Sequence, residues 1–134
     1  MSNFANQSRD VSERVALDLP LHVRHASTVR AASCSIAADC GFTVDEIDDL
    51  RLGVNEVVSV LADVDHDGSG RLLVDFEFTQ GAVRVLARRA DVSVPLSAHD
   101  IDPLAERILR VVTDEFFIDA ETFVVVKRAV KHAS

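Results

Sequence analysis

One long amphipathic helix, predicted over residues 43–64, constrains the fold of this chain more than any other feature. Its apolar side chains recur at alternating steps of three and four, which places them in one stripe along a helix. These residues are Ile47, Leu50, Val54, Val57, Leu61 and Val64. Thr43 followed three residues later by Glu46 is a capping box, which fixes the start of the helix. Such a stripe has to be buried, so we expect the rest of the chain to form layers around it.

The segments before this helix predict an edge strand and a second helix. Residues 14–21, RVALDLPL, alternate between apolar and other side chains, as a half-buried strand does. Pro20 has no N–H to donate, which indicates a strand at the edge of a sheet or its end. Residues 24–40 predict a helix that ends before Gly41. Its buried stripe is expected to be Ala26, Val29, Ser33, Ile36 and Cys40.

The second half of the chain predicts a hairpin, a third helix and a last strand. Residues 71–78 and 82–88 alternate on either side of the turn Gln80-Gly81. Residues 89–101 show no period, so we expect a loop. Asp102-Pro103 indicates a helix start, and the expected stripe is Leu104, Ile108, Val111, Val112 and Phe116. Residues 122–126 are apolar on both faces, as in a central strand.

This order predicts an α+β fold: a two-layer α/β sandwich with a mostly antiparallel sheet and helices on one face. Its 134 residues suit one domain. We expect that domain over residues 14–130, with a disordered N-terminal tail at 1–13 and a C-terminal tail at 131–134.

Composition excludes several functions. The net charge of −8 and the lack of Trp and Tyr argue against direct nucleic-acid binding. No apolar run approaches the ~20 residues of a membrane span, and the first residues lack the apolar core of a signal peptide. Cys34 and Cys40 fall in one helix, too far apart along it for a disulfide. Reduced thiols favour a cytoplasmic protein.

Three segments in order resemble the bacterial anti-sigma factor serine/threonine kinases, which belong to the histidine-kinase-like ATPase group with the Bergerat fold. They are LDLPLHVRHASTVRAASCSIA, DEIDDLRLGVNEVVSVLADV and LAERILRVVTDEFFIDAETFVVVKRA, and the resemblance covers about residues 14–130. The second is similar to the family's helix DDLxLAVxEAxxNAxxH. The resemblance implies that Glu56 matches the family's general base.

The sequence departs from the family where nucleotide and metal are held. The family's Mg²⁺-binding Asn corresponds to Val60, which offers none of the oxygen ligands that Mg²⁺ requires. Asp91 matches the adenine-binding Asp, but Ser93 and Pro95 replace the glycines that should follow. No glycine occurs after Gly81, so a phosphate loop is missing. We therefore expect no cofactor; ATP and Mg²⁺ would be required only if kinase activity survives.

Asp63, Asp65 and Asp67, followed by Gly68, match four positions of a calcium loop. The loop's last ligand should be a bidentate Glu, and that position is Val74. The alternative is a polar turn that ends the long helix.

The first helix offers the best candidates for partner binding, since protein docking does not need the lost nucleotide site. Arg24 and Arg30 are expected to reach solvent, with His25 nearer the buried stripe; the alternative is a solvated helix face. In the family, this helix takes part in dimerisation and in docking the sigma factor or the anti-anti-sigma protein.

The sequence thus predicts an anti-sigma-factor-like regulator of bacterial transcription that acts by protein–protein binding. A homodimer through the first strand and helix is expected, because an edge strand invites pairing. One alternative is an active Mg·ATP-dependent kinase of an anti-anti-sigma factor with Glu56 as base. A weaker alternative is a calcium-responsive variant.

Overall fold

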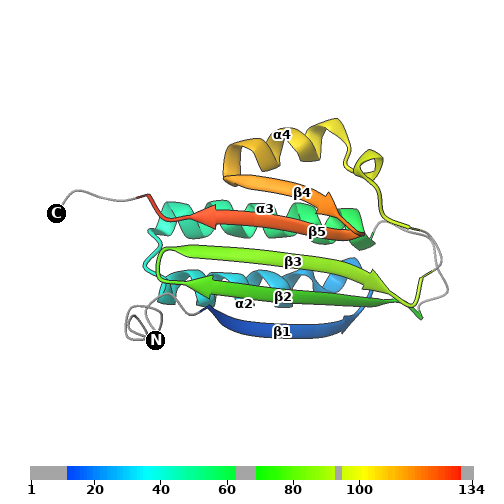
Figure 1. Cartoon of the computed structure of the whole chain (residues 1–134), viewed down its shortest axis with the longest axis horizontal. Coiled ribbons are helices and arrows are strands. Elements are labelled where there is room, and N and C mark those ends of the chain that lie inside the picture. Colours follow the sequence, from blue (N-terminus) through cyan, green and yellow to red (C-terminus); the bar gives the residue numbers. More distant parts are fainter. Residues whose placement is uncertain (1–11, 63–68, 93–94, 131–134) are drawn as a thin grey trace, which may run out of the picture.

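A computed structural model describes residues 12–62, 69–92 and 95–130 of the chain. These residues form a mixed α+β fold with a five-stranded antiparallel sheet in the order β1-β2-β3-β5-β4 and three α-helices (Figure 1). The elements in chain order are β1 Glu13–Pro20, the 3-10 turn η1 Val23–His25, α2 Ala26–Asp39, α3 Val44–Ala62, β2 Arg71–Thr79, β3 Ala82–Ala90, the 3-10 turn η2 Ala98–Asp100, α4 Pro103–Val112, β4 Glu115–Asp119 and β5 Thr122–Arg128.

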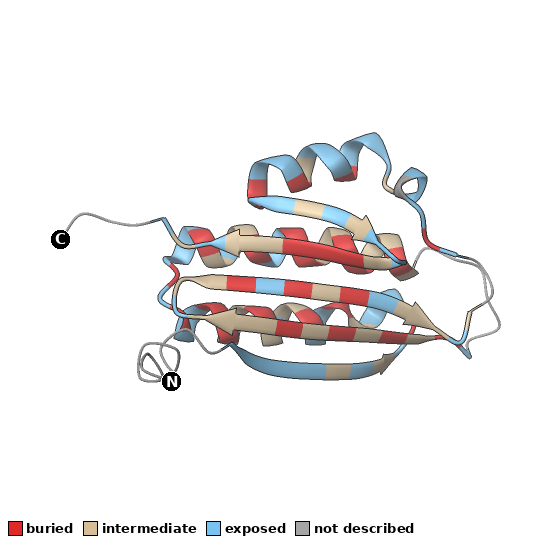
Figure 2. Ribbon diagram, viewed as in Figure 1, coloured by how far each residue is buried: buried red, intermediate tan, exposed pale blue. Residues whose placement is uncertain are grey.

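The helices α2 and α3 lie side by side behind the sheet, and α4 lies beyond β4 (Figure 1). In β2 and β3 alternate residues are buried, as their red bands show (Figure 2). The buried residues of β2 are Leu72, Val74 and Phe76. The predicted mixed α+β fold with its antiparallel sheet is therefore confirmed. The edge position of the first strand is confirmed too, because among the described residues β1 pairs with β2 alone.

The stripe predicted for the first helix is buried in full: Ala26, Val29, Ser33, Ile36 and Cys40. Ser33 is accommodated because its hydroxyl donates to the carbonyl of Arg30 at 2.8 Å, one turn earlier. The helix ends where Gly41 adopts a φ of +84°. The N–H of Phe42 donates to the carbonyl of Ala37 at 3.2 Å, which is the terminal bond of a Schellman motif.

The capping box of α3 is present and extends into a tertiary contact. The Thr43 N–H donates to Glu46 Oε1 at 2.8 Å, and the Glu46 N–H donates to Thr43 Oγ1 at 3.2 Å. Glu46 is buried, and its Oε2 accepts from the N–H of Val130 beyond β5. Both oxygens of the buried carboxylate thus accept hydrogen bonds, and the side chain joins the last described residue to the start of α3.

The prediction for the third helix is wrong about part of its buried face: Val112 is buried as expected, but Leu104 and Val111 are not. The side chains that α4 buries are Ala105, Leu109 and Val112, whereas Leu104 is 67% and Val111 79% exposed. The helix packs against Gly53 of α3, where an added Cβ would meet Thr113 Cγ2 at 3.0 Å. Leu109 is as large as Leu104, so side-chain size does not decide which residues are buried. The rotation of α4 about its own axis against α3 decides it.

The helix also ends earlier than its apolar pattern indicates, because Phe116 belongs to β4, a strand that the sequence did not predict. A two-residue turn joins β4 to β5, and Ala120 and Glu121 both have positive φ, +48° and +68°. That is the geometry of a type I′ turn, which normally carries Asn or Gly. The usual signal for a hairpin is therefore missing here.

The central position predicted for residues 122–126 is confirmed, since β5 pairs with both β3 and β4. Phe123, Val124 and Val125 are all buried, so both faces of the strand are covered. β1 begins at Glu13, the last residue of the predicted N-terminal tail. Residues 1–11 of that tail and the tail at 131–134 lie outside the described part of the chain. No helix in that part is long and apolar enough to cross a membrane.

Candidate functional site

A cavity of about 340 Å³ lies between the second half of α3 and the start of α4. It is lined by Glu56, Ser59, Val60 and Ala62 of α3, by Asp100 and Asp102 before α4, and by Val23 and Ala105. The structure thus places Glu56 and Val60, which the sequence singled out, in one cavity with two further carboxylates. The apolar stripe of α3 faces the core, which turns the next face of the helix toward α4.

Two of these carboxylates are held by backbone N–H groups. Asp102 caps α4 and accepts from the Ala105 N–H at 2.8 Å, as the Asp-Pro pair predicts. Asp100 accepts from the Ser97 N–H at 2.8 Å. The free N–H groups at a helix start are what a phosphate would use, and Asp102 already supplies an anion there. A second anion at this end of α4 would meet like charge.

Glu56 is half-buried, and its carboxylate has no hydrogen bond or ion pair among the described residues. Val60, one turn later, packs against the hydrophobic core and supplies no oxygen. No Lys or Arg lines the cavity. Within the described ranges, no group of three or more His, Cys, Asp or Glu is placed to hold a metal ion. The site can therefore accept a neutral or cationic group more readily than a polyphosphate.

The other sequence candidates for ligand binding do not join this cavity. Asp91 is exposed at the end of β3, with a φ of +62° that Asp tolerates better than most residues. The calcium-loop candidates Asp63, Asp65 and Asp67 lie outside the described residues.

The three candidates for partner binding have different surroundings. Arg24 is exposed in η1, as expected. Arg30 is half-buried, and its Nη1 donates to Asn55 Oδ1 at 2.7 Å, which links α2 to α3. It therefore reaches solvent only in part. His25 is also half-buried, and its Nε2 has no partner among the described residues. Arg24 is therefore the freest of the three for contact with another molecule.

Cys34 and Cys40 are both free. Cys40 is buried, and this burial raises the pKa of its thiol, with the carboxylates of Asp39 and Glu13 adding to the effect. A protonated, buried thiol is unreactive, so Cys40 has the properties of a core residue.

Sequence reasoning missed the contribution of Asp100 and used Asp102 only as a cap. The Asp-Pro pair located the helix start, but nothing in the sequence indicated that this start faces Glu56 across a cavity. That juxtaposition depends on how α4 packs on α3.

The fold and the cavity define a mixed α+β protein with a pocket between two helices. Acidic side chains line this pocket, and no Lys or Arg does. No family model matches the sequence, and no curated protein is significantly similar to it.

Proposed function

We propose that this chain is an anti-sigma-factor-like regulator that works by protein–protein binding in the bacterial cytoplasm, without ATP. The fold we propose is the histidine-kinase-like ATPase fold, because three sequence segments resemble that family. The described order of a strand, two helices, a hairpin, a helix and a final hairpin is compatible with that resemblance.

The observation that carries the nucleotide-free part is the cavity beside Glu56. Three carboxylates line it, Val60 stands where the family has its metal ligand, and no cation is present in its lining. A triphosphate brought there would lose its hydration without gaining an opposite charge, which is strongly unfavourable. A scaffold that has lost its nucleotide chemistry can still present surfaces to a partner.

Isothermal titration calorimetry with ATP and Mg²⁺ tests this part. We expect no measurable heat of binding. A dissociation constant below about 100 μM, within the usual range for enzyme substrates, would contradict the proposal and favour the kinase. In that case Glu56→Gln should abolish phosphate transfer while leaving ATP binding intact, and Ser59→Ala, on the same cavity wall, provides the control.

The surface around Arg24 is proposed to contact the partner, a sigma factor or an anti-anti-sigma protein. Its test is binding of candidate partners to Arg24→Glu, with Arg107→Glu as a control on exposed α4. Arg30 is unsuitable for this purpose, because replacing it would also break the link to Asn55. Equal loss of binding in both variants would show a non-specific charge effect and remove Arg24 from the interface.

A homodimer is proposed through β1, whose outer edge is unpaired within the described residues. If two copies of β1 pair antiparallel about Ala16, Arg14 of each lies opposite Asp18 of the other, a favourable cross-strand pair. Val15 is 38% exposed beside this edge. Sedimentation equilibrium should show a dimer that Val15→Lys weakens, since a lysine on an edge opposes pairing; a monomer at all concentrations would contradict it.

A further inference from the structure

The sheet has a second open edge at β4, and a groove runs along it. Within the described residues β4 pairs only with β5. Helix α4 lies beyond β4 and so extends the helical layer past the last strand (Figure 1). The groove between them measures about 730 Å³. Its walls include Phe116 and Ile118 of β4, Ile101, and Glu106 and Arg110 of α4.

The main chain of β4 is available on this side. The hairpin closes on a two-residue turn, with Asp119 opposite Thr122, and residues that flank such a turn bond to each other. By the alternation of an antiparallel ladder, Phe117 and Glu115 also direct their backbone groups to β5. The N–H and C=O groups of Phe116 and Ile118 therefore point to the open edge. They form a template for one more strand.

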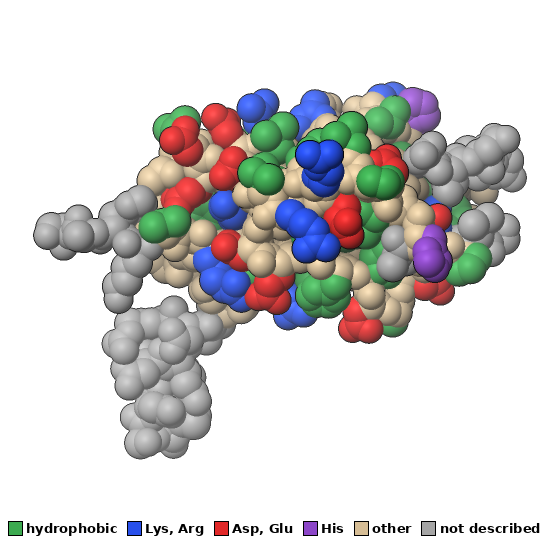
Figure 3. Space-filling view, turned by 90° about the horizontal axis from the view of Figure 1, so that it is seen from above, with side chains coloured by type: hydrophobic (Ala, Val, Ile, Leu, Met, Phe, Trp, Pro, Cys, Tyr) green, Lys and Arg blue, Asp and Glu red, His purple; other side chains and the backbone are tan. Residues whose placement is uncertain are grey.

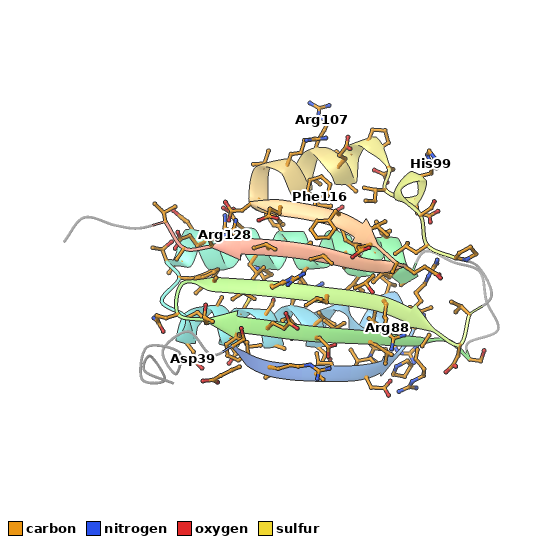
Figure 4. All side chains as sticks on the ribbon, viewed as in Figure 1. Asp39, Arg88, His99, Arg107, Phe116 and Arg128 are labelled. Atoms are coloured by element: carbon orange, nitrogen blue, oxygen red, sulfur yellow. The ribbon has the colours of Figure 1, made fainter. Side chains whose placement is uncertain are left out.

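The side chains of β4 determine which strand would fit. Phe116 and Ile118 pack toward the core, and Phe116 lies beneath α4 (Figure 4) with the Arg110 guanidinium 5.7 Å from its ring centre. An added strand would thus place apolar side chains in the groove. Phe117, on the other face, is 40% exposed and can contact a further side chain.

The charges along the edge indicate a basic occupant. Carboxylates outnumber the cations there: Glu106, Asp114, Glu115 and Asp119 against Arg110 and Arg128. Figure 3, which looks onto α4 from above, shows acidic and basic side chains between exposed hydrophobic ones. Arg110 and Arg128 form ion pairs with Glu106 and Glu115, which leaves Asp114 and Asp119 without an ion pair among the described residues. The Asp119 carboxylate has no hydrogen bond or ion pair among the described residues, and it lies on the same face as Glu115.

We propose that the groove between α4 and β4 binds an extended, basic segment of a partner protein, which adds as a sixth strand beside β4. Its apolar residues lie opposite Phe116 and Ile118, and its basic residues lie opposite Glu115 and Asp119. The peptide Lys-Val-Thr-Val-Lys has this pattern when its Thr faces Phe117. The proposal does not rest on the anti-sigma-like role, and it uses the opposite edge of the sheet from β1.

A second copy of the chain fits this edge less well. Two copies of β4 paired antiparallel about Phe117 would place Glu115 of each opposite Asp119 of the other, and like charges directly opposed destabilise a sheet. A basic strand places opposite charges at the same two positions.

The test is a titration of the ¹⁵N-labelled full chain with the peptide Ac-Lys-Val-Thr-Val-Lys-NH₂, followed by amide chemical shifts. We expect the shifts to change along β4 and α4, not along β1. In the proposed register, the Val N–H groups bond to β4 and the Thr N–H points away. N-methylation of both Val should weaken binding by about tenfold or more, since two hydrogen bonds are lost. N-methylation of Thr is the matched control and should leave affinity nearly unchanged.

A second arm tests the charges. Replacing both Lys of the peptide by Glu should weaken binding to the natural chain, and Asp119→Lys should partly restore it. Equal losses from the two N-methylated peptides would overturn strand addition. Absence of shifts at millimolar peptide, or shifts confined to β1, would overturn the site. Shifts at β4 that change with protein concentration alone would assign the edge to a second copy instead.

Discussion

The packing of α4 on Gly53 gives a prediction whose sign depends on a single methyl group. Gly53→Ala should stabilise helix α3 by about 1 kcal/mol through helix propensity alone. The new Cβ would, however, lie 3.0 Å from Thr113 Cγ2. Thr113 cannot easily turn that methyl away, because its hydroxyl donates to the Leu109 carbonyl at 2.6 Å. Overpacking of this kind costs about 1–3 kcal/mol, so we expect Gly53→Ala to be neutral or destabilising.

Thr113→Ser removes the methyl and keeps the hydroxyl. The next atom that the added Cβ meets is Val112 Cγ2 at 3.6 Å, an ordinary contact. In the Thr113→Ser background, Gly53→Ala should therefore stabilise the protein by about 1 kcal/mol. The coupling between the two substitutions should reach at least about 1 kcal/mol, as residues in direct contact often do.

Urea denaturation of the four proteins, followed by circular dichroism, measures this coupling. If Gly53→Ala changes the free energy of unfolding equally in both backgrounds, within about 0.5 kcal/mol, the close approach of α4 to α3 is wrong. Ala31→Gly, on the exposed face of α2, calibrates the helix-propensity effect in the same protein.

Three further predictions follow from the caps, the last turn and the buried thiol. Glu46→Ala should destabilise the protein by about 1–3 kcal/mol and speed hydrogen exchange at Val130; an unchanged exchange rate would refute the link. Ala120→Asn should raise the midpoint of thermal unfolding, adding about 0.5–1 kcal/mol by relieving a positive φ, and a lower midpoint would contradict the type I′ turn. Iodoacetamide should label Cys34 before Cys40. Because the folded pKa of Cys40 is raised, its contribution to stability is complete below the thiol's usual pKa of about 8.5 and declines as pH rises above it; Cys40→Ala should lose that decline in urea titrations, and an unchanged pH profile would refute it.

Much of the local structure could be predicted from the sequence, since the relevant signals are short-range. The stripe from Ala26 to Cys40, the cap at Asp102 and the turn at Gly81 each follow from spacing or from one residue's backbone preference. The edge position of β1 also followed from a single proline. The prediction failed where two helices pack together. At α4 the predicted stripe included Leu104 and Val111, whereas the packing of the helix on α3 buries Ala105 and Leu109 instead.

The residues of the candidate site likewise fall into those that the sequence identified and those that it did not. The sequence identified Glu56 and Val60, and their spacing on one helix placed them together. It did not place Asp100 and Asp102 across from them, because that depends on how α4 lies against α3. Likewise, Arg30 was expected to reach solvent, and nothing in the sequence indicated that Asn55, 25 positions later in the chain, accepts its hydrogen bond.

By itself, then, the sequence determined the long central helix, its capping box and the lack of a metal ligand at Val60, because periodicity and side-chain chemistry are local properties. Only the tertiary structure decided which face of α4 is buried, that a strand follows it, and that an acidic cavity and an open groove lie on either side of that helix. Those features arise from the approach of segments far apart in the chain, and no short-range pattern records that approach.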